Sequence, residues 1–258
     1  ETENLEATVV AKVTKEPRIV LRWRGDIIVN IARSFLDTNG ADRSASVFVE
    51  APDQKENYRQ KNPANLVGLG LKEAWQKNLT RLEVCSQKGL VECFDSSIGA
   101  GTVLMPFAGK YQQTPENAMV AKVPLLKGET DDATVMSFGY LPGVAHWSPY
   151  HAGAYSIVEA LAKLAATGAD ALSARLSLQE YFPSLGNDAV RWGKPFAALL
   201  GALTAQMELG VPAIGGKDSM SGSFEDLAVP STIVCFALTM TKASKAISAA
   251  LDKPGQKL

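Results

Sequence analysis

The chain has 258 residues, a length that fits one large domain with an additional segment. Hydrophobic residues make up 46% and charged residues 21% of the sequence, which excludes a disordered or fibrous protein. The formal net charge of −1 excludes a strongly basic nucleic-acid-binding protein, so we expect no nucleic-acid partner.

The same sequence indicates where the protein resides. No apolar run approaches the ~20 residues needed to cross a bilayer, and the first residues lack the features of a signal peptide. The odd number of cysteines, three, argues against a disulfide framework and for a reducing compartment. We therefore expect a cytoplasmic protein without a membrane partner. The first residue is Glu1 rather than Met, which indicates a piece of a longer chain.

The first third of the chain combines short strands with a linker. Runs of β-branched residues predict strands at 7–13, 18–23 and 25–31. A short helical turn is expected to follow and to stop at Asn39-Gly40. Residues 41–62 are polar and predict a linker or a chain that lies across a larger body, and a helix is expected to begin at Asn62-Pro63 and to reach Leu79.

From residue 89 onward, predicted strands alternate with two long helices. The strands are expected at 103–107, 119–126, 133–141, 171–182 and 230–241. The first helix should begin after Ser148, an N-cap, and stop at Gly168. The second should cover 190–209, with Gly193 and Pro195 as points where it could break, and a final short helix could start at Lys242. The pattern predicts an α/β fold in which helices cover a sheet.

Residues 215–222, with the sequence GGKDSMSG, form the most unusual segment. Gly215 and Gly216 follow an apolar strand, and paired glycines allow a backbone to approach a ligand and to direct its amides at anionic oxygens. Lys217 adds a positive charge for phosphate. The segment is not a Walker A loop, because Asp218 stands where that motif has Ser or Thr. A phosphate-binding loop and an ordinary Gly-rich turn both remain open.

Glu159 and Lys163 lie four residues apart on the first long helix, with the glutamate N-terminal. This spacing and order favour an ion pair on the helix surface. Without other information, the pair predicts no ligand.

Several segments taken together resemble one known family. They are residues 95–115 (DSSIGAGTVLMPFAGKYQQTP), 150–170 (YHAGAYSIVEALAKLAATGAD), 176–182 (LSLQEYF) and 194–234, which include the Gly-Gly-Lys-Asp-Ser-Met-Ser run. They are similar to phosphoribosylformylglycinamidine synthase, the ATP- and glutamine-dependent ligase of purine biosynthesis that converts formylglycinamide ribonucleotide to its amidine. The large form of this family contains two tandem aminoimidazole-ribonucleotide-synthetase-like repeats and a glutaminase domain in one chain.

The resemblance implies a fold and a division of the chain. Residues 1–40 resemble the C-terminal tail of the first repeat, residues 41–88 a connector with a helix, and residues 89–258 the N-terminal α/β domain of the second repeat. That domain is expected to have a mixed sheet covered by two long helices. The implied partners are the first repeat and the glutaminase domain, and the isolated chain is expected to self-associate through its sheet.

The resemblance also implies what this piece contributes chemically. The catalytic histidine motif and the glutaminase nucleophile of the family are absent, so no catalytic residue is expected. ATP or ADP and magnesium are implied for the parent enzyme. The family's magnesium ligands fall at Ala118, Glu159 and Lys163, of which only Glu159 keeps the family's residue. The implied nucleotide- or phosphate-binding residues are Gly215, Gly216, Lys217, Asp218, Ser219 and Lys163.

Two further expectations follow for this segment. Lys163 is expected to take over the electrostatic role of the metal, with the Glu159–Lys163 pair directed toward Gly215–Ser219. The segment would then be a scaffold or a vestigial nucleotide site. The alternative is a free-standing phosphate- or nucleotide-binding α/β domain without catalysis.

Overall fold

The computed structural model describes residues 3–38, 44–93, 101–251 and 253–255. The chain separates into two compact units, Glu1–Ala45 and Ser46–Leu258. This division does not test the three-part organisation of 1–40, 41–88 and 89–258, which stays a prediction. Among the described residues, no helix is long and apolar enough to cross a membrane.

The first unit is a β-hairpin followed by a short helix. Strands β1 (Arg18–Trp23) and β2 (Asp26–Ala32) pair antiparallel, and α1 covers Arg33–Thr38. Arg24 and Gly25 form the turn with φ angles of 50° and 99°, as a tight two-residue hairpin turn requires. The strand predicted at 7–13 is wrong, because these residues have no partner strand among the described residues to bind their backbone groups. The expected stop at 39–40 lies outside the described residues.

The second unit begins with a connector that contains little regular structure. Its elements are the 3₁₀ turn η1 (Gln54–Glu56), α2 (Leu71–Leu79) and α3 (Lys88–Val91). The helix expected from Asn62 begins only at Leu71. The physical reason is Gly68, whose φ of 81° is incompatible with a right-handed helix.

The body of the second unit is a six-stranded mixed sheet in the order β3-β6-β7-β12-β8-β9. Its strands are β3 (Thr102–Leu104), β6 (Met119–Lys122), β7 (Asp132–Gly139), β8 (Arg175–Tyr181), β9 (Ala213–Ser219) and β12 (Thr232–Lys242). Among the described strands, only β8 and β9 pair parallel. Two small hairpins are formed by β4 (Phe107–Ala108) with β5 (Thr114–Pro115) and by β10 (Ser223–Phe224) with β11 (Leu227–Ala228).

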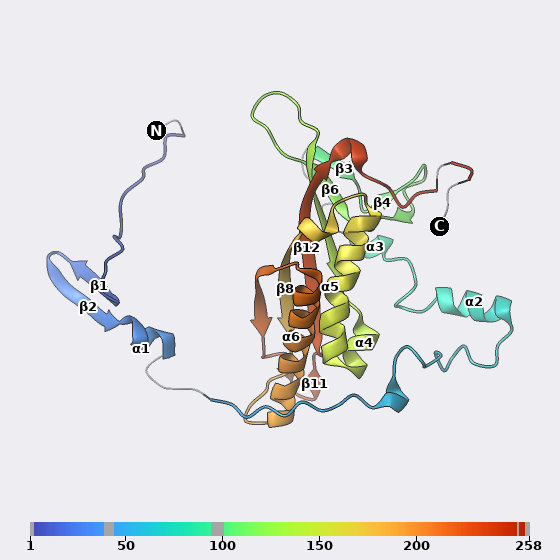
Figure 1. The fold of residues 1–258 in the computed structure, drawn as a ribbon, viewed down its shortest axis with the longest axis horizontal. Helices are drawn as coiled ribbons and strands as arrows, with labels where there is room; N and C mark the ends of the chain where they lie inside the picture. Colours follow the sequence, from blue (N-terminus) through green and yellow to red (C-terminus); the bar gives the residue numbers. More distant parts are fainter. Residues whose placement is uncertain (1–2, 39–43, 94–100, 252, 256–258) are drawn as a thin grey trace. The chain divides into compact units, whose positions relative to one another are not determined.

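Three helices and two 3₁₀ turns complete the described part of the body. They are α4 (Pro142–Trp147), α5 (Pro149–Ala166), α6 (Ala189–Leu209), η3 (Ala171–Ser173) and η4 (Ala243–Lys245). The long helices α5 and α6 lie side by side on one face of the sheet (Figure 1), as expected. Ser148 caps α5, and Gly210 ends α6 with a φ of 66°. The α/β fold with a mixed sheet covered by two long helices is therefore confirmed.

Some boundaries differ from the prediction for local reasons. The strand expected at 103–107 divides into β3 and β4, because Pro106 between them has no N–H to donate to a ladder. Helix α6 is continuous through Gly193 and Pro195, so the break considered there is wrong. The helix expected from Lys242 is only the 3₁₀ turn η4.

Residues alternate along the central strands between a buried face and an open face. In β7, Ala133, Val135 and Ser137 point into the core under the helices. The opposite face of β7 and β12 carries large exposed apolar side chains: Met136, Phe138, Leu238 and Met240. We call the sheet face formed by these four residues, with Phe236, the open face.

Glycines allow the two long helices to touch through their backbones. A Cβ at Gly153 would overlap the carbonyl oxygen of Ala198, and one at Gly201 would overlap that of Tyr150. A Cβ at Gly139 of β7 would likewise overlap the Ser156 carbonyl of α5. The layer of helices is thus fixed at a distance that no larger residue at these positions permits.

Gly153→Ala should lower the free energy of unfolding by about 1–3 kcal/mol, because the added methyl group overpacks the α5–α6 contact. In an ordinary helix the same change would stabilise the protein by about 1 kcal/mol. Urea denaturation followed by circular dichroism measures the difference. Ala162→Gly, on the exposed side of α5, is the control and should cost about 1 kcal/mol from helix propensity alone. A Gly153→Ala protein at least as stable as the wild type would contradict the close approach.

Candidate functional site

The Gly-rich segment forms an edge strand, not a loop. Residues Ala213–Ser219 are β9, which pairs with β8 and has no partner on its other side among the described strands. Gly216 lies opposite Leu178, and a Cβ there would overlap the Leu178 carbonyl oxygen. Both the loop and the Gly-rich turn expected here are therefore wrong for residues up to Ser219, because Gly216 serves the pairing of two strands, while the role of these residues as ligand contacts stays a prediction.

The remaining polar residues of β9 alternate between its two faces. The Lys217 ammonium lies 5.5 Å from the ring centroid of Tyr181, on the open side of β8. Asp218 is in register with Glu180, and the Ser219 hydroxyl is 3.4 Å from that of Ser221. Because neighbouring strand residues face opposite ways, Lys217 and Asp218 do not point at one ligand.

Glu159 and Lys163 form the expected ion pair and bind the end of β7. The Lys163 Nζ lies 2.9 Å from the Glu159 Oε1 and donates a hydrogen bond of 2.9 Å to the Phe138 carbonyl. The Glu159 carboxylate accepts a hydrogen bond of 2.8 Å from the Tyr140 N–H. β6 pairs with β7 only as far as Met136. Beyond that residue, the Phe138 carbonyl and the Tyr140 N–H bind side chains of α5.

The Glu159–Lys163 pair does not point toward Gly215–Ser219, so that expectation is wrong. The pair contacts β7, whereas Gly215–Ser219 lie in β9, and both β12 and β8 stand between them. With about 4.8 Å between neighbouring strands, β7 and β9 are about 14 Å apart. The structure thus does not bring the residues implied by the resemblance into one site.

The positions at which the resemblance places magnesium ligands do not fit that ion. Ala118 offers a methyl group and is 93% buried in the core. Lys163 brings an ammonium group, which repels a cation and which already binds the Glu159 carboxylate and the Phe138 carbonyl. Among the described residues, no group of three or more His, Cys, Asp or Glu side chains is placed to hold a metal ion.

Glu180 is the unusual titratable group of the sheet. Its side chain, in β8, is 1% exposed, and its Oε2 has no hydrogen-bond partner among the described residues. Burial, and secondly the charge of Asp218, raise the pKa of the Glu180 carboxyl to about 7. No sequence signal singled it out, since a glutamate in a strand is ordinarily exposed.

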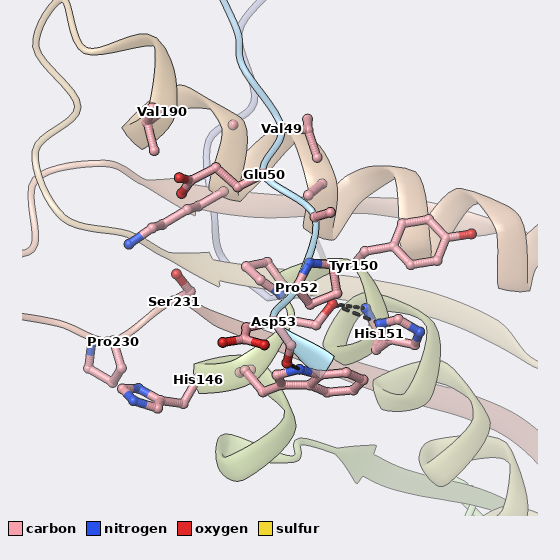
Figure 2. Close-up of a pocket in the computed structure, with 18 of the residues that line it drawn as sticks. Val49, Glu50, Pro52, Asp53, His146, Tyr150, His151, Val190, Pro230 and Ser231 are labelled. Carbon is pink, nitrogen blue, oxygen red and sulfur yellow. Dashed lines mark hydrogen bonds between the residues drawn. The ribbon is translucent and has the colours of Figure 1, made fainter. Parts of the chain in front are cut away.

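A cavity of about 900 Å³ lies where residues 49–53 of the connector cross the first turns of α5 and α6. Figure 2 shows Glu50, Asp53 and His146 around it, and Lys194 also lines it. Its size suits a small molecule. None of the residues implied by the resemblance lines this cavity, and sequence reasoning missed it because its walls come from distant parts of the chain.

The connector is fixed against the body at this cavity. The Phe48 N–H donates to the Ala189 carbonyl at 2.9 Å, and the Trp147 indole N–H donates to the Asp53 carbonyl at 2.9 Å. Gly193 of α6 has no Cβ where the Phe48 carbonyl passes. These contacts therefore attach the connector to the body at Phe48 and at Asp53, on either side of the connector residues that line the cavity.

Ser148 and His151 in the cavity wall form a helix cap rather than a nucleophile and its base. The Ser148 Oγ is 2.7 Å from the His151 Nδ1 (Figure 2) and also accepts from the His151 N–H at 3.4 Å. Ser148 is only 2% exposed, so a substrate carbonyl cannot reach it. Its geometry is that of an N-cap residue.

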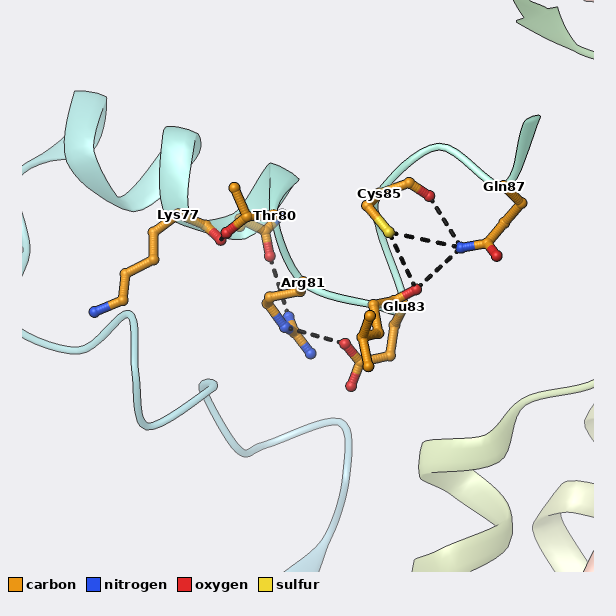
Figure 3. A network of polar contacts seen from close by, with 8 residues as sticks. Lys77, Thr80, Arg81, Glu83, Cys85 and Gln87 are labelled. Atoms are coloured by element: carbon orange, nitrogen blue, oxygen red, sulfur yellow. Dashed lines mark hydrogen bonds and ion pairs between the residues drawn. The ribbon is translucent and has the colours of Figure 1, made fainter. Parts of the chain in front are cut away.

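The polar network after α2 is also structural (Figure 3). Arg81 pairs with Glu83 at 3.5 Å, and the Gln87 side-chain amide donates to the Cys85 carbonyl at 3.1 Å. The Cys85 thiol is free, like those of Cys93 and Cys235. These contacts join near neighbours in sequence and close a turn.

Comparisons with known proteins agree with the resemblance. No family model matches the chain. It is 25% identical over 230 residues to the phosphoribosylformylglycinamidine synthase subunit PurL of Methanosarcina barkeri, covering 88% of this chain and 29% of the relative. It is 24% identical over 255 residues to PurL of Pyrobaculum aerophilum, covering 96% of this chain and 32% of that one.

Solved structures of Thermotoga maritima proteins share the fold. The structure of PurLQS matches with a TM-score of 0.61 and 16% identity, over 92% of this chain and 34% of the solved chain. PurL complexed with ATP matches with a TM-score of 0.57 and 16% identity, over 90% of this chain and 33% of the other. This chain thus spans about a third of the length of the proteins it matches. The predicted resemblance is confirmed: the chain is similar to part of PurL, the phosphoribosylformylglycinamidine synthase subunit, in sequence and in its mixed α/β fold.

Proposed function

We propose that this chain is a segment of a cytoplasmic phosphoribosylformylglycinamidine synthase and that it acts as a scaffold. The proposal rests on the interactions that Glu159 and Lys163 make in this structure. Both side chains are engaged in holding α5 to the end of β7, and the lysine occupies the position of a family magnesium ligand. An ammonium group repels a divalent cation, so the auxiliary nucleotide site of the family is vestigial here.

In the parent enzyme, the chemistry is the ATP- and glutamine-dependent conversion of formylglycinamide ribonucleotide to its amidine. ATP or ADP and magnesium serve that reaction, in which ammonia released from glutamine displaces phosphate from an activated amide. Such chemistry depends on positioning and on charge neutralisation. This segment contributes by holding the parts of the enzyme together, and it supplies no catalytic residue.

The open face is the surface through which we expect this scaffold to bind the rest of the parent chain. It presents Met136, Phe138, Leu238 and Met240 side by side, since Leu238 pairs with Met136 and Phe236 with Phe138 across β12 and β7. A contiguous apolar patch of this kind usually marks a protein interface. The proposed occupant is the first synthetase-like repeat, and the glutaminase domain completes the assembly.

A free-standing phosphate or nucleotide binder is the second candidate. It is favoured by Lys217, which is exposed on the edge strand β9 and is not part of an ion pair with a described carboxylate. Against it stands the alternation of Lys217 and Asp218 between the two faces of β9.

The full chain should bind ADP with magnesium only in the millimolar range or not at all, because Lys163 and Ala118 remove two magnesium ligands. Isothermal titration calorimetry measures this. Lys163→Asn should introduce magnesium-dependent ADP binding, whereas Lys72→Asn on α2 should change nothing. Micromolar binding by the wild type would favour the free-standing binder and contradict the vestigial site.

The isolated chain should self-associate at high concentration, because its open face lacks the proposed partner. Sedimentation velocity should show a dimer or larger species whose population rises with concentration. Leu238→Glu should shift the chain to monomer, since a carboxylate in an apolar interface is costly to desolvate. Leu172→Glu, at an exposed leucine outside the open face, is the matched control. A wild type that stays monomeric at high concentration would count against this surface.

The isolated chain should also form no amidine from formylglycinamide ribonucleotide, ATP and an ammonium salt. The reason is that the sequence lacks the catalytic histidine motif and the glutaminase nucleophile of the family. A coupled phosphate-release assay detects turnover, and any product above the uncatalysed background would overturn the scaffold role.

A further inference from the structure

The edge strand β9 has a partner strand on one side only among the described strands. It pairs with β8 on one side, its Ala213 N–H donates to the Gln206 side chain of α6 at 2.7 Å, and its residues from Ile214 to Asp218 are exposed. Gly215 and Gly216 contribute no side chain to the core. From Ile214 onward, the position of β9 therefore depends on its pairing with β8.

Glu180 acts on that pairing because it lies directly beside Asp218. The two residues are opposite each other in the parallel register of β8 and β9, so their side chains leave the sheet on the same face. Glu180 is 1% exposed, with an oxygen that receives no hydrogen bond from the described residues. A carboxylate in such a place is strongly disfavoured unless it is neutralised.

No cation neutralises Glu180 in the described part of the chain. Its neighbour in register on β12 is Ile233, and along β8 its flanking residue on the same face is Leu178. Lys217 of β9 lies over Tyr181, on the opposite face. None of the ion pairs within the described residues includes Glu180, so the charge that faces it is the like charge of Asp218.

The charged side chains at the start of α6 are directed elsewhere. Arg191 pairs with Asp188 at 3.5 Å and donates to the Ser184 carbonyl at 3.0 Å. Lys194 is exposed and lines the cavity beside the connector. The remaining means of neutralising Glu180 is a proton.

We propose that Glu180 and Asp218 make β9 a proton-sensitive edge strand, which stays paired with β8 while Glu180 is protonated and opens when the proton is lost. The neutral acid removes both the burial penalty and the repulsion by Asp218. The ionised form can regain water only if β9 moves away. Because Lys217 and Ser219 lie on β9, pH then also controls whether these polar residues are held in place.

The direction of the effect follows from proton linkage. The pKa of Glu180 is about 7 in the folded chain and is ordinarily 4.5, so the closed strand binds more protons between these values. Raising the pH through this window therefore favours the open strand. The destabilisation of the closed strand by ionisation of Glu180 is absent below pH 4.5 and complete above about pH 7. From pH 5 to pH 8, the equilibrium constant for opening should rise by up to about 100-fold.

Hydrogen–deuterium exchange of the full chain from pH 5 to pH 8, corrected for intrinsic exchange rates, tests this proposal. Protection of amides 213–219 should fall steeply with pH, while amides of β7 and β12 keep theirs. Glu180→Gln should remove the pH dependence, because an amide does not ionise. Asp218→Asn should reduce its amplitude, and Glu225→Gln, at an exposed residue, should leave it unchanged. A wild-type profile equal to that of Glu180→Gln would overturn the proposal.

A second measurement covers the case in which Glu180→Gln does not fold. Carbon-13 NMR of the glutamate carboxyl groups in the wild type should reveal one group that titrates between pH 6 and 8. If every glutamate titrates below pH 5, Glu180 is an ordinary carboxylate and the proposal is wrong.

Discussion

The backbone contact between α5 and α6 is the constraint on which the rest of the structure depends. Gly153 and Gly201 let each helix meet a carbonyl of the other, and Gly139 lets β7 meet α5 in the same way. At this distance the small side chains of Ala198 and Ala202 pack with the buried face of α5 in the core. The position of every side chain on α5, including Glu159 and Lys163, is set by these contacts.

The fixed distance of α5 explains why the Glu159–Lys163 pair is more than a surface ion pair. An exposed pair contributes well under 1 kcal/mol. Here the side chains are 32% and 23% exposed, and each also binds a backbone group of the β7 end. The Lys163 ammonium further lies 4.4 Å from the centroid of the Phe138 ring. Lys163 therefore holds the end of β7 by a hydrogen bond and a cation–π contact in addition to its ion pair.

Sequence reasoning succeeded where local chemistry decides the structure and failed where distant partners do. Ser148 and Gly210 mark helix ends by their own side chain or conformation, so α5 and α6 were predictable. The segment 7–13 has the composition of a strand, but a strand exists only with a partner, and none is present among the described residues. The same limit applies to the candidate site. The Glu159–Lys163 spacing predicts an ion pair, whereas its direction depends on strand order, which no local pattern contains.

The Gly-rich segment shows how one sequence feature supports two opposite physical readings. Glycines that allow a backbone to approach a phosphate also allow it to approach another strand, and Gly216 does the latter at Leu178. Because Gly216 has no side chain to separate β9 from β8, the two strands pair closely. Their register then places Asp218 beside the buried Glu180. Asp218, one of the candidate ligand contacts, thus has a role within the sheet, because it is the like charge that faces the buried Glu180. The unusual electrostatics of this part of the sheet belong to Glu180 and follow from its burial, without any ligand.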